Sequence, residues 1–164
     1  MRFGFPLLRD SSTESAKCVF CDIVKGNAPS VIIKESKDFL AILDKYPSSK
    51  GMTVIISKGH TPADWVELRA DLLQKASVFS QDTAKLLVKK LKTERVFFVI
   101  EGMEVNHFHI KLYPTYTRKP SPFREVRKQL EYRFDMTNYP DFVATFHGKE
   151  KTTGELKKVR EELR

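Results

Sequence analysis

The sequence predicts an α+β domain in which an antiparallel sheet of about five strands carries one long helix and a short C-terminal helix. Its 164 residues are the usual size of a single domain. Short apolar runs rich in β-branched and aromatic residues recur along the chain, and one longer segment repeats its apolar residues at helical spacing. No apolar run approaches the roughly 20 residues of a membrane-spanning helix, so we expect a soluble cytoplasmic protein with no membrane partner.

The expected strands are short apolar runs in which Val, Ile, Phe and Tyr dominate. They cover residues 31–33, 39–43, 53–56, 96–100 and 107–113. Pro, Gly, Ser and Lys separate most of these runs, and a turn at residues 46–51 (Tyr-Pro-Ser-Ser-Lys-Gly) connects the second run to the third. Strands joined in this way are typical of an antiparallel sheet.

The long helix is expected between the third and fourth strands. Thr61 is a suitable N-cap, Pro62 suits the first helical position, and Asp64 places an acid at the positive end of the helix dipole. The apolar and small residues at helical spacing are Trp65, Leu68, Leu72, Ala76, Phe79, Thr83, Leu86 and Leu87. We expect this stripe to cover one face of the sheet.

The C-terminal part contains a second helix signal. A short helix is expected from about Gly154, with Thr152 as its cap and Glu155 completing a capping box. The chain is therefore divided into a flexible N-terminal extension (residues 1–16), a domain (17–117) and a C-terminal extension (118–164) that packs on the domain or on a dimer partner.

The charge of the chain favours anionic partners. Its 29 Lys and Arg against 21 Asp and Glu give a formal net charge of +8. Nucleotides, nucleic acid and acidic membrane surfaces all suit such an excess, but many basic proteins merely keep themselves dispersed in this way. Charge alone therefore leaves the partner open.

The two cysteines stand as a C-x-x-C pair, Cys18 and Cys21. The pair could be half of a metal site, a redox pair or a chance spacing. A redox pair is expected at the start of a helix within a βαβ unit, whereas this pair precedes every expected strand and no βαβ alternation follows. Two thiolates at this spacing suit tetrahedral zinc if two further ligands come from elsewhere.

The last expected strand, residues 107–113, is the most informative segment. Because side chains alternate along a strand, Phe108, Ile110 and Leu112 would face the core. The opposite face would carry His107, His109, Lys111 and Tyr113. Titratable side chains in such a row favour an anion or a metal as compensating partner, although an exposed edge strand is the alternative.

Two further histidines lie outside this strand. His60 follows the third expected strand and directly precedes the expected helix cap. His147 has no such setting and is interpreted as a surface residue.

From Cys18 to Pro114 the chain resembles the histidine-triad (HIT) superfamily of nucleotide hydrolases and transferases. Residues 18–26 (CVFCDIVKG) resemble the opening of that family, and residues 41–60, with AILD, Pro47, Gly51 and VIISKGH, resemble its central hairpin. Residues 107–114 (HFHIKLYP) resemble its signature strand, in which three histidines alternate with apolar residues. These pieces occur in the family's order, with the expected helix before the signature strand.

The resemblance implies an enzyme and a set of site residues. His109 stands at the nucleophilic middle histidine, and Lys111 stands where the family has its third histidine. The implied ligands of a structural zinc ion are Cys18, Cys21, His60 and His107. The implied nucleotide contacts are Phe20, Ile23, Ile42, Asp44, His109 and Lys111, with Asp44 on the ribose and the three apolar side chains beside the base.

The implied reaction is hydrolysis or nucleotidyl transfer at the α-phosphate of a nucleoside phosphoramidate or a (di)nucleoside polyphosphate. A neutral imidazole can act as the nucleophile near neutral pH, so a nucleotidyl-His109 intermediate is chemically reasonable. Lys111, as a compact charge, could neutralise a phosphate oxygen. An adenosine phosphate conjugate is the implied substrate, and the family implies a homodimer.

The chain also departs from the family. Lys111 replaces a neutral histidine, and the loop at residues 101–106 is short, with Met103 where the family commonly has Gln. Glu101 and Glu104 would repel a phosphate if they pointed inward. The alternative functions are therefore a catalytically weakened nucleotide or nucleic-acid binding protein and, third, a redox protein that uses Cys18 and Cys21.

Overall fold

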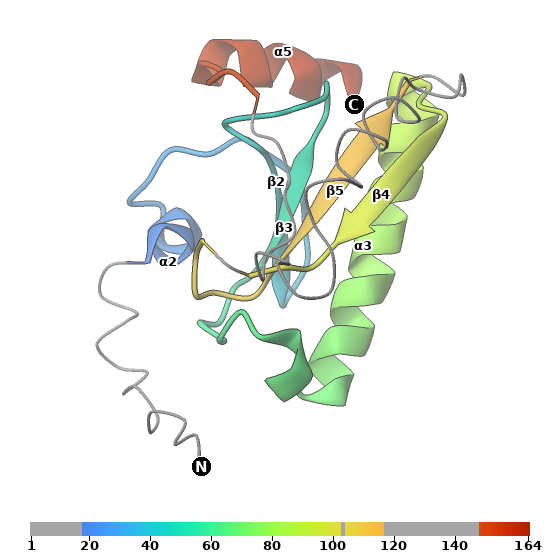
Figure 1. The fold of residues 1–164 in the computed structure, drawn as a ribbon. Helices are drawn as coiled ribbons and strands as arrows, with labels where there is room; N and C mark the ends of the chain where they lie inside the picture. The colour runs from blue at the N-terminus through green and yellow to red at the C-terminus, as the bar shows by residue number, and fades with distance from the viewer. Residues whose placement is uncertain (1–17, 103, 117–147) are drawn as a thin grey trace, which may run out of the picture.

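In the computed structural model, a five-stranded antiparallel sheet lies between a short helix and a long helix (Figure 1). The structure describes residues 18–102, 104–116 and 148–164; the predicted extension 1–16, Met103, His147 and most of the predicted C-terminal extension lie outside them. The elements are α2 (Val19–Lys25), β1 (Ile32–Glu35), β2 (Phe39–Leu43), β3 (Thr53–Ser57), a 3₁₀ helix (Trp65–Glu67), α3 (Ala70–Leu91), β4 (Arg95–Val99), β5 (His109–Thr115) and α5 (Thr153–Glu162).

The strand order is β1-β2-β3-β5-β4, and every neighbouring pair is antiparallel. The predicted fold class is confirmed. β2 and β3 form the hairpin around the predicted turn, and both are completely buried because α2 and α3 cover opposite faces of the sheet (Figure 1).

The main core lies between α3 and the sheet. The sheet contributes Phe39, Ala41, Leu43, Ile55, Ile110 and Leu112, and α3 contributes Ala76, Phe79, Leu87 and Leu91. Phe108, directly before β5, Leu156 of α5 and Leu163, directly after α5, complete this core. The predicted inward direction of Phe108, Ile110 and Leu112 is thus confirmed. Within the described parts of the chain, no helix combines the length and the apolarity needed to cross a bilayer.

The predicted start of the long helix is wrong. Asp64 caps a separate 3₁₀ helix by accepting from the amide of Val66 at 3.0 Å, and α3 begins only at Ala70. The Thr61 carbonyl oxygen accepts from the amide of Phe108 at 2.7 Å. This contact holds the backbone against the segment before β5, so Thr61 cannot begin a continuous helix.

The predicted start of the last strand is also wrong, since β5 begins at His109 and not at His107. The amide of His107 donates to the carbonyl oxygen of Val105 at 2.7 Å, a local turn contact that takes it out of the ladder. The bounds of β1, β3 and β4 differ from the expected runs by one or two residues.

The C-terminal helix follows its local signal. Thr152 accepts from the amide of Glu155 at 3.2 Å, and the Glu155 carboxylate accepts from the amide of Thr152 at 2.9 Å, which is the predicted capping box. The backbone hydrogen bond from Thr152, followed by the contact with Lys151, lowers the pKa of Glu155 to about 2. Leu156 of the same helix is buried against the domain.

Replacing Gly51 with alanine should cost about 2–4 kcal/mol of unfolding free energy, because two penalties add. Gly51 has φ +77°, and an added Cβ would lie 2.3 Å from Cδ1 of buried Leu91. Gly26 has the same φ of +77° with nothing within 4 Å, so Gly26→Ala should cost only about 1 kcal/mol. Urea denaturation of both variants measures the difference; equal costs would show that packing at Leu91 is not limiting.

Candidate functional site

The face of the sheet beneath α2 carries the predicted site. Its buried side chains are Leu40, Ile42, Val54 and Ile56, and Phe20, Ile23 and Val24 of α2 pack against them. Ile56 lies opposite His109 and Val54 lies opposite Lys111 in the register of β3 with β5. Cross-strand partners share a face, so His109 and Lys111 lie on the side of α2, away from the main core.

The ring of His107 is held by the end of β3. Its Nε2 lies 2.8 Å from the carbonyl oxygen of Ser57 and 3.1 Å from the Ser57 hydroxyl oxygen. A carbonyl oxygen only accepts, so Nε2 carries the hydrogen and Nδ1 keeps its lone pair. Because the residue is completely buried, this tautomer is fixed by the fold.

The free nitrogen of His107 points at the two thiols. Nδ1 of His107 lies 3.3 Å from Sγ of Cys18 and 3.5 Å from Sγ of Cys21, and Nδ1 of His60 lies 3.3 Å from Sγ of Cys21. The four ligand atoms all lie within 4.8 Å of one another. Three segments thus bring their ligand atoms together: the start of α2, the residues after β3 and the segment before β5.

These four residues could bind a metal ion. Tetrahedral zinc with sulfur and nitrogen ligands separates a sulfur from a nitrogen by about 3.5 Å, close to the distances found here. Burial raises the pKa of Cys21, and the neighbouring Cys18 raises it further. A divalent cation would offset this cost, because it stabilises both thiolates.

His109 is oriented by the main chain. Its Nδ1 lies 2.7 Å from the carbonyl oxygen of His107 and must donate to it, so Nε2 carries the lone pair. Burial, the largest influence, lowers the pKa of His109, although the hydrogen bond to His107 acts in the opposite direction. The imidazole is therefore neutral at neutral pH. It is 3% exposed, and the ring of Phe20 lies 5.1 Å away between centroids.

Lys111, which the sequence suggests could neutralise a phosphate oxygen, is paired with a carboxylate in the structure. Its Nζ lies 2.5 Å from Oε1 of Glu101, and both side chains are buried. Burial by itself lowers the pKa of Lys111, but the hydrogen bond and the charge of Glu101 outweigh it and raise the pKa overall. Glu101 does point inward, and it meets the lysine that the sequence assigns to a phosphate.

The expected nucleotide contacts lie on the same face. Phe20 and Ile23 pack from α2 on the cluster that contains Ile42, and Asp44 follows β2 directly. The Asp44 carboxylate accepts from the amide of Tyr46 at 2.6 Å, which shapes the hairpin turn. Ile42 lies opposite Val54, and Val54 lies opposite Lys111, so this row joins the expected base pocket to the lysine.

Two residues of the site were not predicted in these roles from the sequence. Ser57 orients His107 with its carbonyl and hydroxyl oxygens, and Glu101 pairs with Lys111. Ser57 ends a strand without any distinctive motif. A buried lysine requires an opposite charge nearby, and Glu101 stands two residues after the end of the neighbouring strand β4. This position is the sequence feature that could have identified Glu101 as the partner of Lys111.

Comparison with known proteins agrees with this geometry. A family model described as HIT domain matches residues 25–118. An uncharacterized HIT-like protein of Mycoplasma genitalium is 32% identical over 129 residues, which cover 76% of this chain and 85% of that protein. The adenosine 5′-monophosphoramidase of Saccharomyces cerevisiae is 34% identical over 106 residues, covering 63% of this chain and 65% of that protein.

Solved structures share the fold. A zinc-bound histidine triad family protein from Mycobacterium smegmatis superposes with a TM-score of 0.66 at 23% identity, covering 91% of this chain and 94% of that chain. Similarity at this level of identity concerns the arrangement of the helices and strands. It is consistent with the sheet order and with the position of the two covering helices described above.

Proposed function

The chain belongs to the HIT domain family, and from this premise we propose that it hydrolyses or transfers the nucleotidyl group of a nucleoside phosphoramidate or a dinucleoside polyphosphate through His109. The family supports a nucleotide hydrolase or transferase in general. One observation supports His109 as the nucleophile: its Nδ1 donates to the carbonyl oxygen of His107, which leaves Nε2 unprotonated.

With a phosphoramidate, the proposed reaction has two steps. The Nε2 lone pair attacks the α-phosphorus, a nitrogen–phosphorus bond forms, and the bond to the leaving amine breaks as that nitrogen takes up a proton from solvent. Water then attacks the phosphorus of nucleotidyl-His109 and gives up a proton to solvent, the bond between phosphorus and Nε2 breaks, and the nucleoside monophosphate leaves the regenerated imidazole. Because His109 is 3% exposed, the substrate must displace what covers the ring.

The proposed metal is zinc, bound by Cys18, Cys21, His60 and His107, whose mutual distances fit it. Four protein ligands leave no open position, so the ion has a structural role. It would hold the ring of His107, whose carbonyl oxygen orients His109. The zinc-bound structural neighbour supports this choice. Reduced thiols persist in the cytoplasm, which is the location that we propose.

The proposed nucleotide pocket is the apolar cluster under α2. Phe20, Ile23 and Ile42 would contact the base, and Asp44 would accept from the ribose hydroxyls. The name of the phosphoramidase among the relatives supports an adenosine nucleotide as the ligand. A binding protein without turnover is the second candidate. The Glu101–Lys111 pair favours it, because the lysine is already engaged by a carboxylate.

The experiment is incubation of the purified protein with adenosine 5′-phosphoramidate and, separately, with diadenosine tetraphosphate. Release of AMP, together with an acid-labile nucleotidyl group on the protein, is the expected result. Binding of AMP without any release from either conjugate would favour the second candidate. If the protein shows no AMP binding and no turnover of either conjugate, both candidate functions are refuted.

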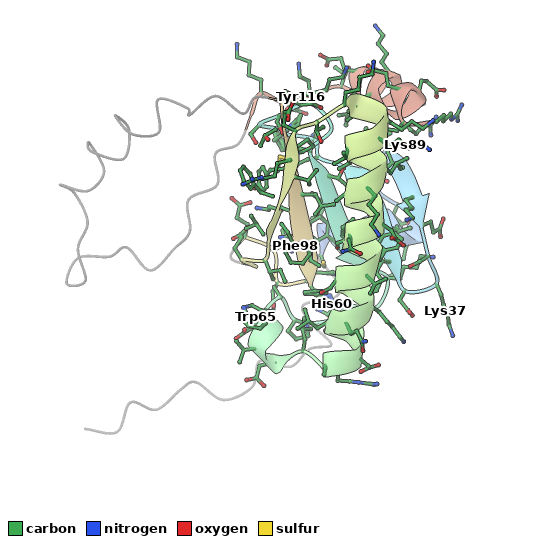
Figure 2. The ribbon with its side chains drawn as sticks, turned by 90° about the vertical axis from the view of Figure 1, so that its right-hand side faces the viewer. Lys37, His60, Trp65, Lys89, Phe98 and Tyr116 are labelled. Carbon is green, nitrogen blue, oxygen red and sulfur yellow. The ribbon has the colours of Figure 1, made fainter. Side chains whose placement is uncertain are left out.

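The proposed assembly is a homodimer formed at the β4 edge of the sheet. Among the described residues β4 pairs only with β5, so its outer edge offers unpaired backbone groups to a second copy. Phe97 and Phe98 of this strand are about half-exposed, and Figure 2 shows Phe98 and Trp65, which is also exposed, on the same side of the molecule. Because successive residues of a strand face opposite sides, the rings of Phe97 and Phe98 leave apolar surface exposed on both faces beside this edge, which a second copy could cover.

Replacing Phe98 with glutamate should convert the dimer to a monomer, because it places a charge in the buried centre of the proposed contact. Sedimentation equilibrium measures the mass. Ile32→Glu, an exposed apolar position on the opposite edge strand β1, is the matched control and should leave the dimer intact. A monomeric wild-type protein would contradict this assembly.

A further inference from the structure

A buried ion pair lies next to the proposed nucleophile. Nζ of Lys111 is 2.5 Å from Oε1 of Glu101, and the two side chains are 8% and 7% exposed. Lys111 lies two residues beyond His109 in β5, on the same face of the sheet. Glu101 follows the end of β4, the strand that pairs with β5.

The two cross-strand neighbours of Lys111 are apolar, while Glu104 and Tyr113 also act on its charge. Val54 of β3 and Val99 of β4 are the cross-strand neighbours of Lys111, one on each side. A lysine between two valines loses its hydration, and an opposite charge must compensate for that loss. Glu101 supplies this charge, and it remains within contact distance because the sheet places β4 beside β5.

The pair also changes the electrostatic attraction for a phosphate bound at His109. An unpaired Lys111 would attract any phosphate bound at His109. A Lys111 that is neutralised by Glu101 attracts it much less, and the carboxylate itself repels a phosphate that approaches from its side. The charge of Lys111 becomes available only when an anion takes the place of the carboxylate.

We propose that Glu101 is a positioning residue that holds Lys111 beside His109 and masks its charge, so that an anion gains this charge only by displacing the Glu101 carboxylate. The inference rests on the proposed function for the identity of the anion, a nucleoside phosphate. It predicts that the site selects against additional negative charge. The dianionic product AMP is therefore bound weakly and released readily.

The first measurement is nucleotide affinity by calorimetry, with adenosine as the uncharged reference. Glu101→Gln should tighten AMP about tenfold and leave adenosine unchanged, because it unmasks Lys111. Lys111→Met should weaken AMP about tenfold or more, because it leaves the carboxylate uncompensated. The double variant Glu101→Gln/Lys111→Met should return AMP affinity toward that of the wild type.

A lysine that acts without masking gives a different pattern. In that case Glu101→Gln leaves the AMP affinity unchanged, and the double variant behaves like Lys111→Met alone. Either result would overturn the proposal. A purely structural role for Glu101 would change the AMP and adenosine affinities together, and this would also overturn it.

The second measurement needs no ligand. Each single variant should lower Tm by roughly 6–20 °C, because breaking a buried pair leaves a charge unpaired, and the double variant should lose clearly less. Glu101→Asp, which retains the charge, should recover part of the loss. If the loss of Tm in the double variant equals the sum of the two single losses, the two residues are not coupled, and the proposed ion pair is refuted.

The matched control is the ion pair between Lys58 and Glu35, which has the same separation of 2.5 Å but side chains that are 29% and 56% exposed. Glu35→Gln should lower Tm by no more than about 3 °C, because exposed pairs contribute little. If the wild type binds neither AMP nor adenosine and releases no AMP while the unfolding coupling is present, the proposed function and the masking role fail, and the ion pair alone stands.

Discussion

Replacing His109 with alanine should reduce the turnover of adenosine 5′-phosphoramidate by at least about 1000-fold, because it removes the nucleophile and not merely a contact. The nucleotidyl-protein intermediate should disappear with it. Steady-state kinetics and mass spectrometry of acid-free quenched samples measure the two effects. The expectation depends on the unprotonated Nε2 that the hydrogen bond from Nδ1 to His107 leaves available.

The control for this variant lies on the same strand. Tyr113 is partly exposed in β5 and faces the same side of the sheet as His109, so Tyr113→Phe reports on changes in the strand without removing the imidazole. It should retain turnover within about threefold of the wild type. Equal turnover by the wild type and His109→Ala would remove His109 from the mechanism.

Replacing Cys21 with serine should abolish stoichiometric zinc binding and lower Tm by at least about 10 °C. A thiolate contributes to the binding of zinc far more than a hydroxyl does, and the metal would join three segments that are distant in the sequence. Cys21 lies close to two other ligands, at 3.3 Å from His60 and 3.5 Å from His107. Elemental analysis and calorimetry measure the two effects.

A chelator provides the matched control for the cysteine variant. It should lower the Tm of the wild type to near that of Cys21→Ser and leave the variant unchanged, because the same stabilising contribution has been removed in both. A wild-type protein without zinc, in which Cys18 and Cys21 form a reversible disulfide, would contradict the metal site and favour the redox alternative.

Local signals predicted some element ends and failed at others, and the tertiary contacts explain the difference. The capping box of Thr152 and Glu155 is made by neighbours in the sequence, and α5 begins where they predict. Thr61, Pro62 and Asp64 form an equally good local signal. Their backbone is instead held by the segment before β5, through the Thr61 contact with Phe108, and the long helix starts at Ala70.

His107 and His109 also show where local patterns stop predicting the structure. Alternation correctly places His109 and Lys111 on one face, opposite Ile110 and Leu112 of the core. It does not reveal that His107 precedes the strand, because the contact between its amide and Val105 is a turn contact without a sequence signature.

The fold class followed from periodicity along the chain, because apolar spacing is a property of neighbouring residues. The resemblance of its motifs to the HIT family indicated the family and the four residues that converge at the proposed metal site. The folded structure was needed to show which nitrogen of each imidazole is free and which carboxylate faces Lys111. Those features depend on backbone carbonyl groups and on a cross-strand neighbour. Such partners are distant in the sequence or carry no side-chain pattern, so folding alone brings them within hydrogen-bonding distance.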